Sequence, residues 1–139
     1  MKPKILYTAV KALIKNTEAK VLVLKQADPT ITGGNQYHPP GGILELGESL
    51  KECVEREVEE EIGVKCKAKQ LFDVGEWQAE RGKDTMQFVG LFYVCELEPG
   101  PFILQDEEAS EVEWAGIEEI DTLDILEPSK SIIRRFLLE

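Results

Sequence analysis

Several stretches of the chain have a pattern of hydrophobic residues that is typical of β-strands. Short apolar runs rich in Val, Ile and Leu lie at residues 5–14 and 19–26, and further strand-like stretches lie at 64–78, 84–98 and 110–117. Polar turns join the first two stretches and also the third and fourth, so we predict a hairpin at each place. A short extended piece at 37–42 ends in two glycines.

The period changes to that of an amphipathic helix in two places. Ser49 and Glu52 have the spacing of a capping box, and Gly63 is a suitable C-terminal cap, so we predict a helix between them. Residues 127–139 have helical spacing of large apolar side chains, with Pro128 expected in the first turn. The pattern predicts an α/β fold in which helices pack on the faces of a mixed β-sheet.

The first predicted helix carries its acidic residues on two different faces. On a helical wheel, one apolar arc contains Leu50, Cys53, Val54, Val58 and Ile62, and the opposite side contains Glu48, Glu52, Glu55 and Glu59. We expect those four glutamates to face solvent. Glu57 and Glu61 fall inside the apolar arc, and Glu60 lies at its edge.

Glu57 and Glu61 are one turn apart in a predicted buried position, where their mutual repulsion is costly. Two carboxylates about 5–6 Å apart repel by about 3 kcal/mol at an effective dielectric constant near 20. A hard divalent cation, Mg²⁺ or Mn²⁺, would relieve this repulsion. Pairing with Arg56 or with a lysine elsewhere would relieve it as well, and the spacing alone leaves both explanations open.

Gly41 and Gly42 precede this helix and allow a close approach of the backbone to a neighbouring group. The turn is suited to presenting backbone groups to a metal ion or a phosphate. An ordinary strand-to-helix connection explains the same two glycines.

Composition limits the partners of the chain. With 139 residues, the chain is expected to form one domain over 1–139. Its formal net charge of -11 disfavours nucleic-acid polymers and anionic membranes as partners. No apolar run reaches bilayer length, and the start of the chain does not have the pattern of a signal peptide. Three scattered cysteines and a single histidine lack zinc-ligand spacing, which favours reduced thiols in a cytoplasmic protein.

Residues 42–64 resemble the Nudix box at every fixed position. The match consists of Gly42, five residues, Glu48, seven residues, Arg56-Glu57-Val58, one residue, Glu60-Glu61, one residue and Gly63-Val64. The resemblance implies an α/β/α sandwich and hydrolysis of a nucleoside diphosphate linked to another moiety, with Mg²⁺ or Mn²⁺ required.

The resemblance also implies roles for individual residues. Glu57, Glu60 and Glu61 would hold the metal, and the carbonyl of Gly41 would complete its shell. Arg56 would orient a glutamate of the box, whereas Glu48, on the far side of the wheel, would have a supporting role together with Gly42. We therefore predict that Glu57→Gln and Glu61→Gln remove turnover, and that Glu55→Gln and Glu59→Gln are nearly silent.

Family members often add an acidic residue from a loop ahead of a late strand that ends in tryptophan. Here that loop offers Asp106, Glu107, Glu108 and Glu111, of which Glu108 is the first choice by its distance from Trp114. A solvated acidic loop is the alternative interpretation. Either Glu57 or Glu108 would act as the general base.

The prediction of the substrate rests on the absence of markers that other subgroups of the family carry. Residues 77–84 lack the proline of ADP-sugar hydrolases and the tyrosine of dinucleoside polyphosphate hydrolases, which favours a nucleoside triphosphate pyrophosphohydrolase resembling the MutT group. ADP-ribose or ADP-sugar pyrophosphatase activity is the alternative, followed by a non-catalytic nucleotide-binding module.

Other features of the sequence are less informative about the site. Tyr37, Trp77 and Trp114 are suited either to stacking on a base or to core packing. His38 is not expected to be catalytic. A homodimer is expected from the resemblance alone.

Overall fold

The computed structural model describes residues 4–26, 36–104 and 109–139. Its elements are β1 (Lys4–Ile14), β2 (Val21–Gln26), β3 (Tyr37–His38), β4 (Gly41–Ile43), α1 (Leu50–Ile62), β5 (Cys66–Arg81), β6 (Asp84–Leu97), β7 (Ala109–Ala115) and α2 (Ser129–Leu137). The strands form two sheets, with orders β4-β1-β6-β5 and β3-β2-β7. Strands β1 and β6 run parallel and β1 and β4 antiparallel, so the larger sheet is mixed, as predicted.

The predicted hairpin between the first two strands is wrong. Strands β1 and β2 belong to different sheets, and between them the chain turns with an antiparallel bridge at Lys15 and Val21 and a hydrogen bond from the Asn16 N–H to the Lys20 carbonyl. Strand β1 pairs with β6 along one edge and with β4 at Ala9–Lys11 on the other. Strand β2 pairs instead with β3 and β7.

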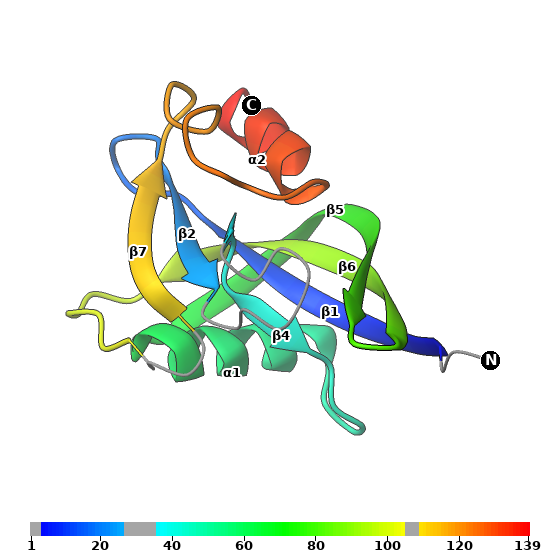
Figure 1. The fold of residues 1–139 in the computed structure, drawn as a ribbon. Coiled ribbons are helices and arrows are strands. Elements are labelled where there is room, and N and C mark those ends of the chain that lie inside the picture. Colours follow the sequence, from blue (N-terminus) through cyan, green and yellow to red (C-terminus); the bar gives the residue numbers. More distant parts are fainter. Residues whose placement is uncertain (1–3, 27–35, 105–108) are drawn as a thin grey trace.

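The two helices cover opposite faces of the strands, as Figure 1 shows with α1 below and α2 above. Val10 and Ala12 of β1 belong to the core cluster that includes buried residues of α1. Leu13 of β1 belongs to the second cluster, which contains Ile132 and Phe136 of α2. Because successive side chains of a strand point to opposite faces, β1 contributes to both cores. The predicted sandwich of helices around a mixed sheet is confirmed.

Helix α1 has the predicted ends. The Ser49 hydroxyl accepts a hydrogen bond from the Glu52 N–H at 3.1 Å, and the Glu52 carboxylate accepts one from the Ser49 N–H at 2.9 Å. Gly63 adopts a left-handed conformation with φ of 71° and ends the helix. Helix α2 begins at Ser129, so Pro128 is its N-cap and does not belong to its first turn as predicted.

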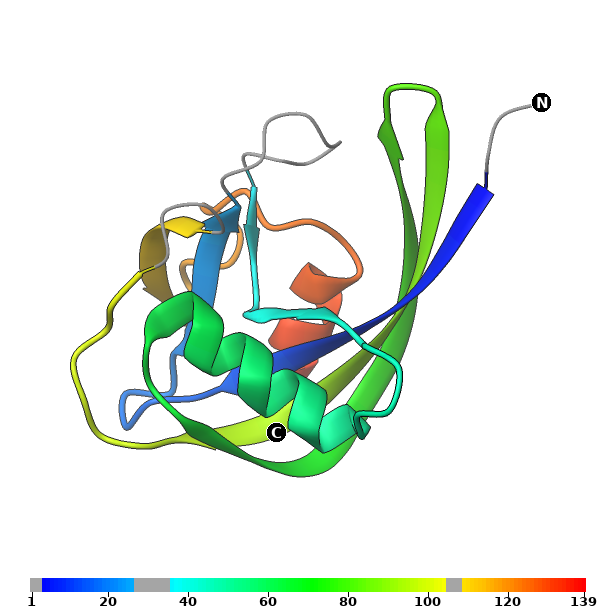
Figure 2. The ribbon, with the colours of Figure 1, turned by 90° about the horizontal axis from the view of Figure 1, so that it is seen from below.

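The predicted second hairpin is present as β5 and β6, which pair antiparallel up to Arg81 and Asp84. Seen from below, its tip extends beyond the body of the molecule beside the start of β1 (Figure 2). The three cysteines are free and buried. Neither helix in the described part of the chain is long and apolar enough to cross a membrane.

Candidate active site

Two glycines of β4 lie directly against α1. The N–H of Gly41 donates a hydrogen bond to Oε1 of Glu61 at 2.7 Å. A Cβ on Gly42 would overlap the carboxyl group of Glu57. Only glycine at position 42 leaves room for that carboxylate, so the glycine turn and the helix define one site together.

Glu57 and Glu61 occupy the buried side of α1, as the helical wheel predicts. Glu61 is 3% exposed, and the side chain of Glu57 is 14% exposed. Both line a cavity of about 700 Å³. Part of their charge is compensated within the protein, because Arg56 Nη1 donates to Glu57 Oε1 at 2.9 Å. The pairing with Arg56 that the sequence left open is therefore present for Glu57.

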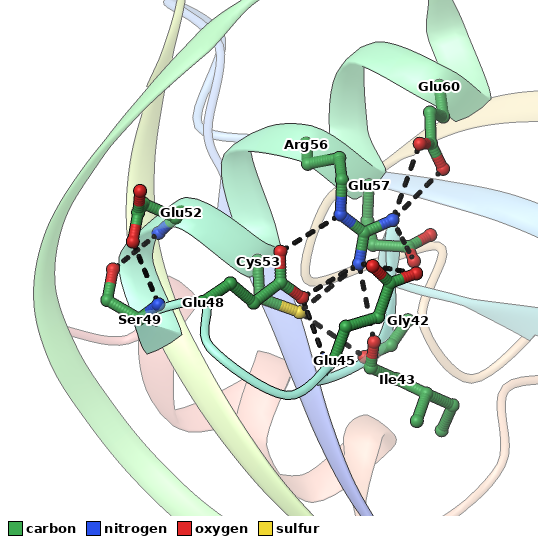
Figure 3. A network of polar contacts seen from close by, with 10 residues as sticks. All are labelled: Gly42, Ile43, Glu45, Glu48, Ser49, Glu52, Cys53, Arg56, Glu57 and Glu60. Atoms are coloured by element: carbon green, nitrogen blue, oxygen red, sulfur yellow. Dashed lines mark hydrogen bonds and ion pairs between the residues drawn. The ribbon is translucent and has the colours of Figure 1, made fainter.

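Arg56 is the centre of a polar network in front of α1 (Figure 3). Its Nε and Nη2 donate to the two carboxylate oxygens of Glu48 at 3.0 and 2.9 Å. Its Nη1 reaches Glu57 and also Glu60, the latter at 3.2 and 3.3 Å. These carboxylates, Glu48 first, raise the pKa of Arg56. Arg56 therefore fixes the direction of Glu57 from outside the cavity.

The predicted position of Glu48 on the solvent side of α1 is wrong. The helix begins at Leu50, so Glu48 precedes it and the wheel does not apply. Its side chain, 16% exposed, turns back to Arg56 in a bidentate pair. The hydrogen bond from Arg56 and a backbone hydrogen bond in the Glu45–Glu48 turn lower the pKa of Glu48 to about 2.

The pair between Glu48 and Arg56 makes stability depend on pH. Because the folded state depresses the pKa of Glu48 from 4.5, its contribution is complete above that value and is lost as pH falls toward about 2. We expect Glu48→Gln to lower the melting temperature at pH 7 and the gap from wild type to close between these two values. Melting curves from pH 7 to pH 2.5 test this, and a gap that stays constant would contradict it.

The remaining glutamates of α1 differ from the expectation at one position. Glu59 is exposed, as predicted. Glu55 accepts a hydrogen bond from the N–H of Ala68 at 2.9 Å and thereby joins α1 to β5. The amide of Glu55→Gln keeps an oxygen that can accept this hydrogen bond, so its near-silence stays a prediction, and Glu59 is the simpler control position because its side chain is exposed.

Three of the four expected metal-binding residues are adjacent in the structure, and the fourth, Glu60, points elsewhere. Glu57, Glu61 and Gly41 are adjacent, whereas the side chain of Glu60 is 49% exposed and paired with Arg56. Among residues 4–26, 36–104 and 109–139, no group of three or more His, Cys, Asp or Glu side chains is gathered closely enough to hold a metal. Glu108 lies outside the described residues.

Aromatic rings form part of the cavity wall. Trp77 stacks on Phe88 with centroids 5.2 Å apart, and Tyr7 stacks on the same ring at 5.3 Å. The sequence singled out Trp77 but missed Tyr7 and Phe88, which lie on adjacent strands in register. The other aromatic candidates have different contacts. Trp114 packs beside Phe102 against the core.

The hydroxyl of Tyr37 donates to Glu111 at 2.7 Å. This hydrogen bond, with burial and the nearby charge as smaller causes, raises the pKa of Tyr37 to about 12. Neither Tyr37 nor Trp114 is among the residues that line the cavity.

Lys11 and His38 also line the cavity, and the sequence did not indicate that they would meet. Burial lowers the pKa of Lys11, whereas the charges of Glu61 and Glu57 raise it. Burial, with the charge of Lys11, lowers the pKa of His38 to about 3, so its ring is neutral near pH 7. His38 Nδ1 lies 2.9 Å from the carbonyl oxygen of Pro39, which fits a ring that donates from Nδ1.

The donors at this site suit a hard divalent cation. Glu57 and Glu61 supply carboxylate oxygens at low exposure, and the glycines of β4 bring backbone within reach of both side chains. Mg²⁺ and Mn²⁺ prefer such oxygen ligands over sulfur or nitrogen. The donor chemistry therefore fits the expected metal.

Comparison with known proteins agrees with the Nudix-box resemblance. A family model described as NUDIX domain matches residues 6–136. "Nudix hydrolase 6" of Arabidopsis thaliana is 36% identical over 113 residues, which are 79% of this chain and 39% of that protein. "NAD-capped RNA hydrolase NudC" of Mannheimia succiniciproducens is 28% identical over 99% of this chain and 48% of its own length.

The fold has close relatives among solved structures. The MutT protein of Methanosarcina mazei Go1 superposes with a TM-score of 0.81 and 25% identity, covering 96% of this chain and 94% of its own. The chain spans less than half the length of the two curated relatives above.

Proposed function

This chain belongs to the NUDIX domain family of hydrolases, and from that premise we propose that it hydrolyses a phosphoanhydride bond with the help of a divalent cation. The substrate is a nucleoside diphosphate linked to another moiety. The favoured reaction is that of a MutT-type pyrophosphohydrolase, which converts a nucleoside triphosphate to a monophosphate and pyrophosphate.

One observation carries this proposal. Glu57 and Glu61 are held against Gly41 and Gly42 at the wall of a cavity large enough for a nucleotide. Two neighbouring carboxylates of low exposure attract a cation, and a cation there would face whatever fills the cavity. The stacked rings of Trp77, Phe88 and Tyr7 offer apolar surface for a base in the same cavity.

Glu57, Glu61, Glu60 and the carbonyl of Gly41 are the proposed ligands of the cation. When bound, the cation neutralises phosphate oxygens, makes the phosphorus more electrophilic and lowers the pKa of a coordinated water. Arg56 holds Glu57 in place through its pair with Glu48. Glu60 would have to leave its 3.2 Å contact with Arg56 to serve as a ligand. Glu57 or Glu108 takes the proton of the attacking water.

The MutT-type substrate rests on two supports. Residues 77–84 lack the subgroup markers for ADP-sugars and dinucleoside polyphosphates, and the MutT protein of M. mazei matches along almost its whole length. ADP-ribose hydrolysis is the second candidate, because a cavity of about 700 Å³ lies within the usual size range of sites for ligands of that size.

A nucleotide panel tests the proposal. The protein is incubated with Mg²⁺ and with nucleoside triphosphates, ADP-ribose or ADP-glucose, and the products are separated by ion-exchange chromatography. We expect a monophosphate and pyrophosphate from at least one triphosphate, and no product in excess EDTA. Turnover of ADP-ribose alone would select the second candidate. Binding without turnover across the whole panel would contradict an enzymatic role.

A further inference from the structure

Lys11 is the cationic side chain that β1 places beside the two buried acids. It lies opposite Gly41 in the antiparallel register of β1 and β4, and the N–H of Gly41 is the group that bonds Glu61. A Cβ on Gly41 would lie 2.8 Å from Cα and 2.9 Å from Cδ of Lys11. Gly41 therefore packs directly on the backbone and the stem of Lys11.

The surroundings of the Lys11 ammonium contain acids and a neutral ring. Burial lowers the pKa of Lys11, and the charges of Glu61 and Glu57 act in the opposite direction and favour the ammonium form. On another side, Nζ lies 3.5 Å from Nδ1 of His38, whose ring carries no charge near pH 7. Lys11, His38, Glu57 and Glu61 all line the same cavity. The Lys11 side chain thus faces the same cavity as the two carboxylates that are proposed to bind the cation.

We propose that Lys11 is an exchangeable counter-ion, which neutralises Glu57 and Glu61 in the metal-free protein and holds a phosphate oxygen of the substrate once a divalent cation has bound. This inference rests on the proposed function. A divalent cation at the carboxylates repels the ammonium, and a lysine has a flexible stem that lets its charge move to a new partner. The phosphate chain supplies that partner in the same cavity.

The proposal predicts opposite effects of one substitution on metal and on substrate. Lys11→Met keeps the stem and removes the charge. In the absence of nucleotide, we expect Mn²⁺ to bind roughly tenfold more tightly, because its competitor is gone. In the presence of Mg²⁺, we expect KM for the substrate to rise roughly tenfold or more, because a charge-assisted hydrogen bond to phosphate is lost.

Electron paramagnetic resonance of free Mn²⁺ measures the first effect on nucleotide-free protein, and steady-state kinetics measure the second. Lys51→Met on the exposed side of α1 is the matched control and should change neither quantity. Lys11→Arg keeps the charge and should bind Mn²⁺ within about threefold of wild type. Damage to the fold would weaken Mn²⁺ binding, so tighter binding has no simple structural explanation. Lys11→Gln repeats the test if Lys11→Met does not fold.

The outcomes separate this inference from the function on which it rests. Unchanged or weaker Mn²⁺ binding by folded Lys11→Met and Lys11→Gln would overturn the role of Lys11, even if wild type hydrolyses nucleotides normally. Wild type that binds no Mn²⁺ would overturn the metal site itself. Tighter Mn²⁺ binding together with a higher KM supports the exchange.

Discussion

Replacing Glu61 by Gln should lower kcat roughly a thousandfold or more while the protein stays folded. The amide keeps the size of the carboxylate and an oxygen that accepts from the N–H of Gly41, so the hydrogen bond at 2.7 Å can persist. What disappears is a charged ligand at the proposed metal site, and a cation there contributes several kcal/mol to stabilising the transition state. Kinetics in saturating Mg²⁺, with circular dichroism to check folding, measure this effect.

Glu59→Gln is the matched control for Glu61→Gln, because it removes the same charge from an exposed position of the same helix. We expect it to retain activity within about twofold. Glu57→Gln should behave like Glu61→Gln. Equal losses at Glu59 and Glu61 would mean that the net charge of the helix matters and that the buried position does not.

Replacing Gly42 by Ala should have the second largest effect, although it removes no charged group. The added methyl overlaps the carboxyl group of Glu57, which must move away. The carboxyl group is the far end of a flexible side chain, so its shift should cost little stability, whereas displacement of a proposed ligand should lower kcat roughly a hundredfold. Melting temperature and kcat, both measured on purified protein, give the two effects.

Gly47→Ala separates the loss of stability from the loss of activity. Gly47 has a φ of 87° and no neighbour against which a Cβ would collide. Alanine there is strained, so the melting temperature should fall while kcat of the folded protein is unchanged. If Gly42→Ala also lost only stability, the contact between Gly42 and Glu57 would have no role in catalysis.

The sequence was sufficient to predict the elements whose signals are local. The ends of α1 follow from Ser49, Glu52 and Gly63, which act within one turn of the helix. The buried position of Glu57 and Glu61 follows from the helical period, because a helix of 13 residues presents one continuous face to the core. Residues 42–64 also carry the family resemblance, and the match of the NUDIX domain model confirms it.

Features that depend on contacts between distant segments were not predictable. The alternation in residues 5–26 indicates strands but cannot tell which edge each strand pairs with, so the expected hairpin was wrong. The contact of Lys11 with Gly41 depends on the register of β1 and β4. Glu48 was misplaced because a wheel was extended past the cap, where the backbone is no longer helical.

The partners of the proposed metal ligands were only partly predictable from the sequence. The family resemblance gives Glu57, Glu60 and Glu61 the same role, whereas in the structure Glu61 accepts from the Gly41 N–H and Glu60 pairs with Arg56. The Arg56–Glu60 pair agrees with its i,i+4 spacing, but the bond between Gly41 and Glu61 joins segments 20 residues apart and could not be read from spacing. The chosen base, Glu108, lies outside the described residues and stays a prediction.

The central claim is that Glu57 and Glu61 hold a divalent cation against the glycine turn. Anomalous diffraction from a crystal soaked in Mn²⁺, recorded above and below the manganese absorption edge, tests it most directly. We expect an anomalous peak within coordination distance, roughly 2.0–2.3 Å, of carboxylate oxygens of both residues. A crystal soaked in saturating Mn²⁺ that shows no anomalous peak beside these two carboxylates would contradict the claim.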